Sequence, residues 1–229
     1  MSNDELLNAV AELATIGGRE AMRFFRGPLN IEYKSNGSIV TVADRTTEER
    51  MREWIRARFP ADGILGEELG EERPGAERRW LIDPIDGTIA YTNGSAEWGT
   101  LVAVARGETV LAGAINCAAL SELACAAVGR GCWMNGSRAR VSNVRTIARA
   151  RPALNDCHGY LLVATGRADV MLDPRMGPWD SAPLQPIICE AGGVFTDWEG
   201  RATAFGGSAI ATNAALATKA RQLLTGSAP

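Results

Sequence analysis

Hydrophobic residues near the start of the chain recur with the period of an α-helix. Between residues 3 and 25 the apolar positions are three to four residues apart and share one face of a helix: Leu6, Leu7, Val10, Leu13 and Ala14. Ser2 and Glu5 stand three residues apart just before this run, the spacing of a capping box. We therefore expect an amphipathic helix over residues 3–25.

A hairpin and a second helix are expected next. Residues 31–33 and 39–42 alternate on either side of Asn36-Gly37, a dipeptide typical of tight turns. From residue 44 to residue 59 the helical period returns, and Pro60 ends it. The buried face of this second helix is predicted at Met51, Trp54, Ile55 and Phe59.

The middle of the chain has the pattern of a β-sheet. Short apolar runs separated by turn sequences predict strands over residues 80–82, 100–105, 109–115, 122–128 and 132–134. Because short turns join neighbouring strands, we expect the strands to run antiparallel. Together with the two helices they form a layered α+β unit.

Beyond residue 142 helical and strand patterns alternate over shorter lengths. We expect helices near 157–166, 180–191 and 214–224, and strands near 168–172, 194–197 and 209–212. A weakly periodic stretch with several arginines begins at residue 143. We therefore predict an N-terminal α+β domain over residues 1–142 and a smaller α/β domain over residues 143–229.

Composition narrows the function classes. The chain has 229 residues, of which 46% are hydrophobic and 22% charged, with a formal net charge of −3, so we expect a globular protein without a nucleic-acid partner. His158 is the only histidine, which excludes sites that need two imidazoles. The N-terminus is acidic, and no run approaches the roughly 20 apolar residues of a membrane span. We expect a cytoplasmic protein with no membrane partner.

The five cysteines are widely spaced and contain no CxxC pair: Cys117, Cys125, Cys132, Cys157 and Cys189. This pattern argues against a disulfide framework and against a zinc ribbon. We expect all five to be small buried hydrophobic residues.

Carboxylates gather at three places within apolar surroundings. Glu67 and Glu68 follow Gly66, the pair Asp83 and Asp86 flanks Pro84-Ile85, and Asp180 stands at the start of a predicted helix. Carboxylates that share a site need cations to offset their repulsion, and oxygen ligands without His or Cys suit Mg²⁺ better than zinc. The amides of Gly87 and Thr88 could hold a phosphate if a helix starts there.

Each string taken by itself has a simpler interpretation. Asp-Pro-x-Asp-Gly is most often a turn, Glu67-Glu68 a solvated patch, Asp180 a helix cap and Thr88 a turn hydroxyl. Their occurrence together in one chain favours a metal site.

These strings resemble the motifs of the inositol-monophosphatase-like family of Mg²⁺-dependent phosphomonoesterases. The matching segments are residues 40–44 (VTVAD), 66–68 (GEE), 80–88 (WLIDPIDGT), 179–182 (WDSA) and 190–193 (EAGG). The resemblance implies a layered α-β-α-β-α sugar-phosphatase fold. Residues 99–101 (GTL), 156–160 (DCHGY) and 163–169 (VATGRAD) are most similar to the histidinol-phosphate phosphatase branch, which implies L-histidinol phosphate as substrate, in histidine biosynthesis.

The resemblance also implies a role for each matching residue. Two or three Mg²⁺ ions would be held by Glu67, Asp83, the carbonyl of Ile85, Asp86 and Asp180, with Asp83 bridging two of them. The catalytic residues would be Asp44, Glu67 and Thr88: Thr88, positioned by Asp44, would orient the attacking water on the ion that Glu67 holds, and Glu68 would support this group from behind the ligands. Phosphate oxygens would lie on the amides of Gly87 and Thr88, and Asp156 and Asp173 would contact the alcohol part of the substrate. An anionic side chain there suits a cationic amine better than an uncharged cyclitol.

The chain departs from the family between residues 143 and 156, where relatives carry a few dozen more residues. A missing strand leaves backbone groups unpaired unless something covers them, and a homodimer is the assembly that the resemblance implies. Smaller departures are Ile89, Tyr91 and Glu97.

Three other functions are alternatives to this one. One is an inositol-1-phosphate phosphatase of the same family, and another is a catalytically weak homologue with a structural or regulatory role. The third is a haloacid-dehalogenase-type phosphatase, which needs an aspartate two residues before Asp86, where this chain has Pro84.

Overall fold

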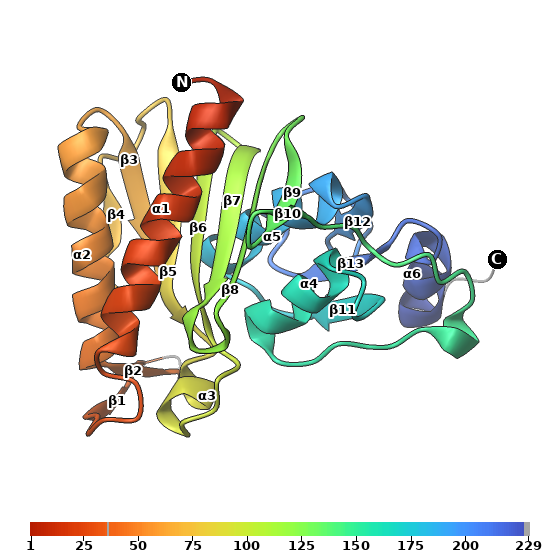
Figure 1. The fold of residues 1–229 in the computed structure, drawn as a ribbon, viewed down its shortest axis with the longest axis horizontal. Helices are drawn as coiled ribbons and strands as arrows, with labels where there is room; N and C mark the ends of the chain where they lie inside the picture. Colours follow the sequence, from red (N-terminus) through yellow and green to blue (C-terminus); the bar gives the residue numbers. More distant parts are fainter. Residues whose placement is uncertain (36, 227–229) are drawn as a thin grey trace.

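The computed structural model describes residues 1–35 and 37–226 (Figure 1). Its helices are α1 (Asn3–Met22), α2 (Val42–Arg58), α3 (Thr88–Thr92), α4 (Asp156–Ala164), α5 (Pro178–Glu190) and α6 (Ala217–Thr225), with short 3₁₀ turns η1 (Ala118–Leu120) and η2 (Ile147–Arg149). Its strands are β1 (Ile31–Tyr33), β2 (Ile39–Thr41), β3 (Gly63–Gly66), β4 (Gly70–Glu72), β5 (Arg79–Asp86), β6 (Gly99–Arg106), β7 (Thr109–Cys117), β8 (Glu122–Ala127), β9 (Gly131–Met134), β10 (Ser137–Arg138), β11 (Val170–Asp173), β12 (Gly193–Thr196) and β13 (Ala209–Asn213).

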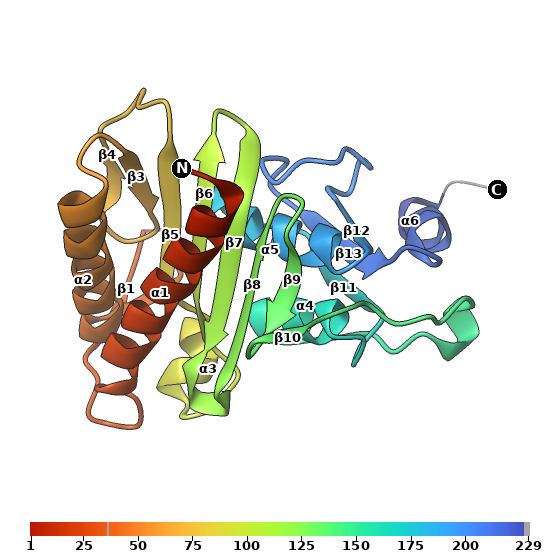
Figure 2. The ribbon, with the colours of Figure 1, turned by 45° about the horizontal axis from the view of Figure 1, so that its top comes forward.

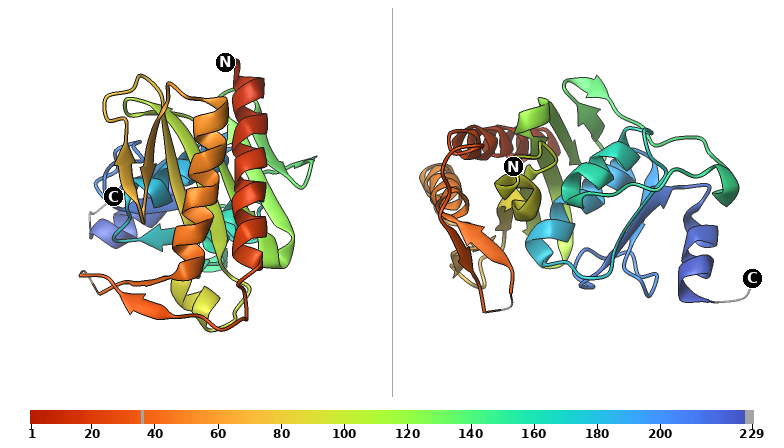
Figure 3. Two further views of the ribbon diagram at one scale, coloured as in Figure 1. Left: turned by 90° about the vertical axis from the view of Figure 1, so that its left-hand side faces the viewer. Right: turned by 90° about the horizontal axis from the view of Figure 1, so that it is seen from below.

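The elements stack in five layers, as Figures 2 and 3 show. Helices α1 and α2 cover one face of an eight-stranded sheet with the order β10-β9-β8-β7-β6-β5-β3-β4, and α5 and α4 lie against its other face. Beyond them is a three-stranded sheet, β11-β13-β12, and α6 packs on its outer side. The α+β class and the α-β-α-β-α layering expected from the sequence are therefore confirmed.

Strand β6 shows why both faces of the large sheet are apolar. Val102 and Val104 face the core beneath α1 and α2, while Leu101 and Ala103 face the core beneath α5. All four side chains are fully buried. A central strand covered on both faces is a continuous apolar run rather than an alternating one.

The first helix forms as its sequence predicts. The Ser2 hydroxyl accepts a hydrogen bond from the Glu5 amide, and the Glu5 carboxylate accepts one from the Ser2 amide at 2.6 Å. The predicted apolar face is buried or partly buried against the sheet. Among the described residues, no helix is long and apolar enough to cross a membrane.

Several short elements were not predicted, namely β3, β4, α3 and β10. Ile64 and Leu65 are the only large apolar residues of β3 and are flanked by glycines, so the local pattern is too short to indicate a strand. The strand forms because it pairs in parallel with β5, whereas purely antiparallel pairing was expected. The β1–β2 hairpin is present, but Asn36 of its predicted turn lies outside the described residues.

The cysteine prediction is partly wrong. All five cysteines lie within the described residues and none forms a disulfide. Cys117, Cys132 and Cys157 are buried and Cys125 is partly buried, but Cys189 is exposed near the end of α5. Its position on the helix follows the packing of α5 between two sheets, which the sequence pattern does not reveal.

The segment between β10 and α4 is fixed by Asp169, which precedes β11. The buried Asp169 carboxylate accepts hydrogen bonds from the Ser142 hydroxyl and from the Arg151 backbone amide (2.7 Å) and side chain (2.9 Å). Pro152 also forms a parallel bridge to Val170, so the chain runs along the free edge of β11. The division at residues 142 and 143 into two domains stays a prediction.

We expect Asp169→Asn to destabilise the protein by about 1–3 kcal/mol at pH 7, because a buried charge network loses its acceptor. Burial opposes the charged form of Asp169, but the hydrogen bonds from Arg151 and Ser142 outweigh it and lower the pKa. A lowered carboxyl pKa adds stability above the unfolded-state value of about 3.9, and this stability is lost as the pH falls through the folded-state value. Urea melts over a range of pH values should show the full deficit at pH 7 and a deficit that shrinks as the pH falls below about 3.9. A deficit that does not change with pH would contradict this role.

Candidate active site

The end of strand β5 carries two aspartates around a break in its hydrogen-bonding ladder. The pairing of β5 with β6 is irregular between Asp83 and Asp86, because Pro84 has no amide hydrogen to donate. The Thr100 hydroxyl donates to the Pro84 carbonyl at 2.9 Å, and the Ile85 amide donates to the Asp83 carboxylate at 2.9 Å. The bond from Ile85 fixes the orientation of the Asp83 carboxylate, and the bond from Thr100 holds the backbone beside it.

Three of the predicted ligands come together from three elements. Oxygen atoms of Glu67, Asp83 and Asp180 all lie within 4.8 Å of one another. Glu67 follows β3, Asp83 lies in β5, and Asp180 lies in the first turn of α5. Asp180 is not the cap itself, since the helix is capped at Gly177, whose amide donates to the Asp180 carboxylate at 2.7 Å.

Asp86 lies beside this triad rather than within it. Asp86 and Asp180 line the same cavity of about 110 Å³. One oxygen of Asp86 accepts a hydrogen bond of 2.6 Å from the Cys157 amide at the start of α4. Because this hydrogen bond occupies Oδ2, the other oxygen of Asp86, Oδ1, is available to bind a metal ion.

The charges of the cluster fit a divalent cation. Burial, and then the charges of Glu67, Asp86 and Asp180, raise the pKa of Asp83 well above its usual range. Burial and the charge of Asp180 do the same to the pKa of Asp86, and burial and Glu67 raise that of Asp180 to about 7. One buried and three partly buried carboxylates repel one another unless cations compensate them, and the donor set consists of oxygen atoms only.

Thr88 and Asp44 approach one another next to the cluster. Asp44 lies in the first turn of α2, where its Oδ2 accepts hydrogen bonds from the Thr41 amide and hydroxyl at 2.8 and 2.6 Å. Its Oδ1 is 3.4 Å from the Thr88 hydroxyl, which also lies 3.0 Å from the Ile85 carbonyl oxygen. Thr88 is therefore within reach of Asp44, the group that the resemblance associates with it, and of the Ile85 carbonyl.

Gly87 and Asp156 pack closely where two cavities meet. Gly87 has φ 83°, and a Cβ added there would lie 3.1 Å from the Asp156 carboxylate. A cavity of about 220 Å³ is lined by Glu67, Gly87 and Thr88, and Asp156 lines both it and the 110 Å³ cavity. Because only glycine adopts this φ readily and leaves this space, Gly87 lets Asp156 approach the end of β5.

Asp173 also lines the 110 Å³ cavity. It ends β11, and its carboxylate accepts a hydrogen bond of 2.8 Å from the buried Tyr160 hydroxyl. Burial raises the pKa of Asp173 and that of Asp156. Every residue predicted for the site therefore lies in or beside these two cavities.

Two residues that the sequence did not single out also belong to this region. The Lys34 ammonium, from the β1–β2 hairpin, donates to Glu67 at 2.9 Å and to Glu68 at 2.6 Å. Burial raises the pKa of Glu68 to about 7, although the hydrogen bond from Lys34 acts to lower it. Glu48 of α2 is fully buried and accepts hydrogen bonds from the Glu68 and Leu69 amides. An acidic residue on the predicted buried side of the second helix is the signal that could have revealed Glu48.

Gly66→Ala should displace the loop that carries Glu67. A Cβ at residue 66 would lie 2.0 Å from the Glu48 carboxylate, so that carboxylate would have to leave the two amides it holds. We expect a loss of about 3 kcal/mol in stability together with weaker metal binding. Gly75→Ala is the control for a loss of stability alone: its φ of 84° makes alanine unfavourable, but a Cβ there meets nothing within 4 Å and so leaves Glu48 undisturbed. Equal Mg²⁺ affinity of the two variants by calorimetry would contradict the role of Gly66.

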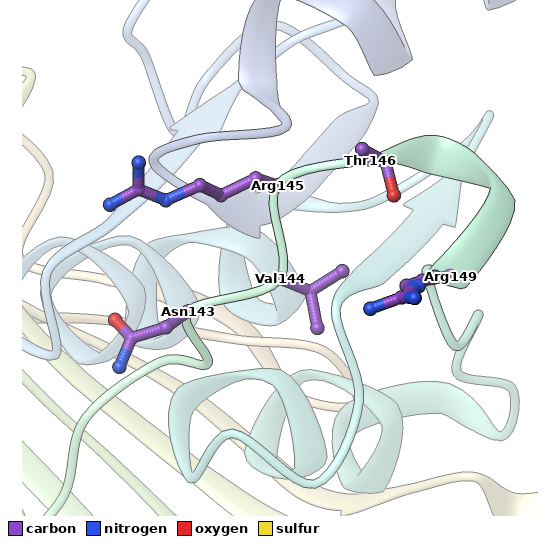
Figure 4. A pocket seen from close by; sticks show the side chains of 5 residues that line it. All are labelled: Asn143, Val144, Arg145, Thr146 and Arg149. Atoms are coloured by element: carbon purple, nitrogen blue, oxygen red, sulfur yellow. The ribbon is translucent and has the colours of Figure 1, made fainter.

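Another hollow lies away from this cluster, on the segment before α4. Its volume is about 630 Å³, and Asn143, Val144, Arg145, Thr146 and Arg149 line it. Figure 4 shows the guanidinium groups of Arg145 and Arg149 far apart, so they do not converge on one point. The hollow contains no candidate catalytic group.

The sequence of this chain is similar to those of known phosphatases. The model of the inositol monophosphatase family matches residues 2–155 and 146–227. The chain is 36% identical to a histidinol-phosphatase of Chlorobaculum parvum, over 89% of this chain and 90% of that protein. It is 31% identical to a fructose-1,6-bisphosphatase/inositol-1-monophosphatase of Aquifex aeolicus, over 86% and 87% of the two chains.

A solved structure of an IMPase from Thermotoga maritima superposes with a TM-score of 0.87 at 27% identity, covering 96% of each chain. The alignment with the Chlorobaculum protein has 233 positions, whereas 89% of 229 residues is about 204, so about 29 positions have no counterpart in this chain. The two stretches matched by the family model meet at residues 146–155. This is the segment that the sequence predicts to be shortened.

Proposed function

This chain is a phosphatase of the inositol monophosphatase family, and on that premise we propose that it hydrolyses L-histidinol phosphate with the help of Mg²⁺. The observation that carries the proposal is the acidic wall of the 110 Å³ cavity, formed by Asp156 and Asp173 beside Asp86 and Asp180. A phosphorylated alcohol that also bears an ammonium group is complementary to that wall.

The residues that would hold two or three Mg²⁺ ions are Glu67, Asp83, the carbonyl of Ile85, Asp86 and Asp180. Three of them already share a site, and the burial and mutual repulsion of these carboxylates favour a cation. When bound, such ions lower the pKa of a water molecule and neutralise the leaving alkoxide.

Thr88 would orient the attacking water. Its single hydroxyl proton can be donated either to the Ile85 carbonyl or to Asp44. If the Ile85 carbonyl is engaged elsewhere, the proton goes to Asp44 Oδ1, and a lone pair of Thr88 Oγ1 is then free to accept a hydrogen bond from the water. The Thr41 amide and hydroxyl hold Asp44 in place for this role. No covalent intermediate with the protein is required.

The substrate would lie across the two cavities. Its phosphate would contact the amides of Gly87 and Thr88 in the 220 Å³ cavity. Its amine would approach Asp156 at the junction, with Asp173 beyond. The name of the Chlorobaculum relative supports this substrate, whereas the name of the Aquifex relative supports inositol-1-phosphate as the alternative.

The test is phosphate release from L-histidinol phosphate, inositol-1-phosphate and p-nitrophenyl phosphate, with Mg²⁺ and with EDTA. We expect release from L-histidinol phosphate only when Mg²⁺ is present, at a higher kcat/KM than from the other two esters. A folded protein that releases phosphate from none of them would instead be the catalytically weak homologue.

The remaining expectations belong to the same proposal. A homodimer would cover backbone left open by the shortened segment, and the free thiols suit a reducing cytoplasm. Size-exclusion chromatography with light scattering tests the first of these.

A further inference from the structure

The chain enters α4 through two consecutive residues with left-handed backbone conformations. Asn155 has φ 71° and ψ 75°, and Asp156 has φ 41°. Such values are uncommon for residues with a Cβ and persist where the surrounding structure enforces them. Asparagine and aspartate tolerate this conformation better than other side chains, and β-branched residues tolerate it least.

This turn presents two groups to the site at once. The Asp156 carboxylate lies against Gly87, where the two cavities meet. The next amide, that of Cys157, donates a hydrogen bond of 2.6 Å to the Asp86 carboxylate. The conformation of this one turn therefore sets two positions at once. It places Asp156 in the cavity that would bind the alcohol, and it places the Cys157 amide against Asp86, a proposed metal ligand.

Contacts on both sides leave the turn little freedom. Before it, the Ala153 amide donates to the Val170 carbonyl at 2.7 Å, which ties the chain to the edge of β11. After it, the Gly159 amide donates to the Asn155 carbonyl at 3.1 Å. A Cβ on Gly159 would lie 2.7 Å from the Leu154 carbonyl oxygen, so helix α4 packs closely under the turn.

The contribution of Asn155 lies in its backbone rather than its side chain. Its side chain makes no capping hydrogen bond to α4. Glycine adopts a φ of about 70° without steric cost, whereas alanine and valine adopt it with increasing difficulty. Residue 155 can therefore be changed in a graded way without removing a side-chain hydrogen bond that caps α4.

We propose that Asn155 is a positioning residue whose left-handed backbone fixes the Asp156 carboxylate and the Cys157 amide relative to Asp86. The role assigned to Asp156 rests on the proposed function. The effect of Asn155 on Asp86 does not depend on which ester is hydrolysed.

The test compares Asn155→Gly, Asn155→Ala and Asn155→Val. Mg²⁺ binding is measured by calorimetry, and kcat and KM are measured with L-histidinol phosphate and with the same ester lacking its amine. We expect the glycine variant to stay within about 3-fold of wild type in every quantity. The alanine and valine variants should bind Mg²⁺ more weakly, and should lose at least about 10-fold in kcat/KM for the amine-bearing ester but less for the other.

The outcomes separate the two proposals. If alanine and glycine variants with equal melting temperatures also show equal Mg²⁺ affinity and equal substrate preference, Asn155 is not a positioning residue. If both lose activity on the two esters equally, the role of residue 155 is structural and the inference is wrong. If wild type hydrolyses no ester or shows no preference for the amine, the proposed substrate fails, while the Mg²⁺ affinities still decide the role of Asn155.

Discussion

Asp83→Asn is expected to reduce Mg²⁺-dependent phosphate release by at least about 10³-fold, or ~4 kcal/mol in the barrier at ~1.4 kcal/mol per tenfold. Asp83 is almost fully buried between Glu67 and Asp180, and it is the residue proposed to bridge two ions. An amide supplies one neutral oxygen where the carboxylate supplies two charged ones, so it cannot compensate two cations. The measurement is kcat with L-histidinol phosphate over a range of Mg²⁺ concentrations.

The same variant is expected to fold normally. The asparagine oxygen can still accept the hydrogen bond from the Ile85 amide, and the neutral side chain removes repulsion within the cluster. Without metal, the melting temperature of Asp83→Asn should equal or exceed that of wild type, while Mg²⁺ should stabilise wild type and not the variant. Retained turnover would show that Asp83 is not a ligand, and a collapsed fold would contradict the argument from repulsion.

Asp156→Asn is expected to change substrate selection more than turnover. Asparagine keeps the size of the side chain and removes its charge from the wall that faces the amine. We expect kcat/KM for L-histidinol phosphate to fall about 10–100-fold, or ~1.4–2.8 kcal/mol, with most of the change in KM. With the ester that lacks the amine, the change should stay below about 3-fold.

Asp173→Asn is the matched comparison for Asp156→Asn, because Asp173 lines the same cavity but is already hydrogen-bonded to Tyr160. Its effect on the amine-bearing ester should be smaller. A double-mutant cycle between Asp156→Asn and removal of the substrate amine isolates their interaction. A coupling energy near zero would mean that Asp156 does not recognise the amine.

The sequence predicts those parts of the fold whose patterns are long. Helix α1 and strands β6 and β7 carry enough apolar positions to define a period, and the capping box of α1 forms as expected. Strand β3 could not be predicted because it is stabilised by pairing with β5, which is not its neighbour in the sequence. The exposure of Cys189 likewise depends on how α5 packs, and this packing cannot be predicted from the residues around Cys189.

The candidate site could be predicted as far as motifs define it. Glu67, Asp83 and Asp180 converge although they come from the loop after β3, from β5 and from α5. Lys34 has no motif around it, and only the fold of the β1–β2 hairpin brings it to Glu67. The left-handed conformations of Asn155 and Asp156 could not be predicted from the sequence either, because asparagine and aspartate also adopt ordinary turn conformations.

The most direct test of the central claim is the ratio of kcat/KM for L-histidinol phosphate to kcat/KM for inositol-1-phosphate, measured on the wild-type protein in saturating Mg²⁺. The acidic wall of Asp156 and Asp173 predicts a ratio of at least about 10, all of it dependent on Mg²⁺. A ratio of one or less, with a folded and active protein, would contradict the claim that this cavity selects a cationic alcohol.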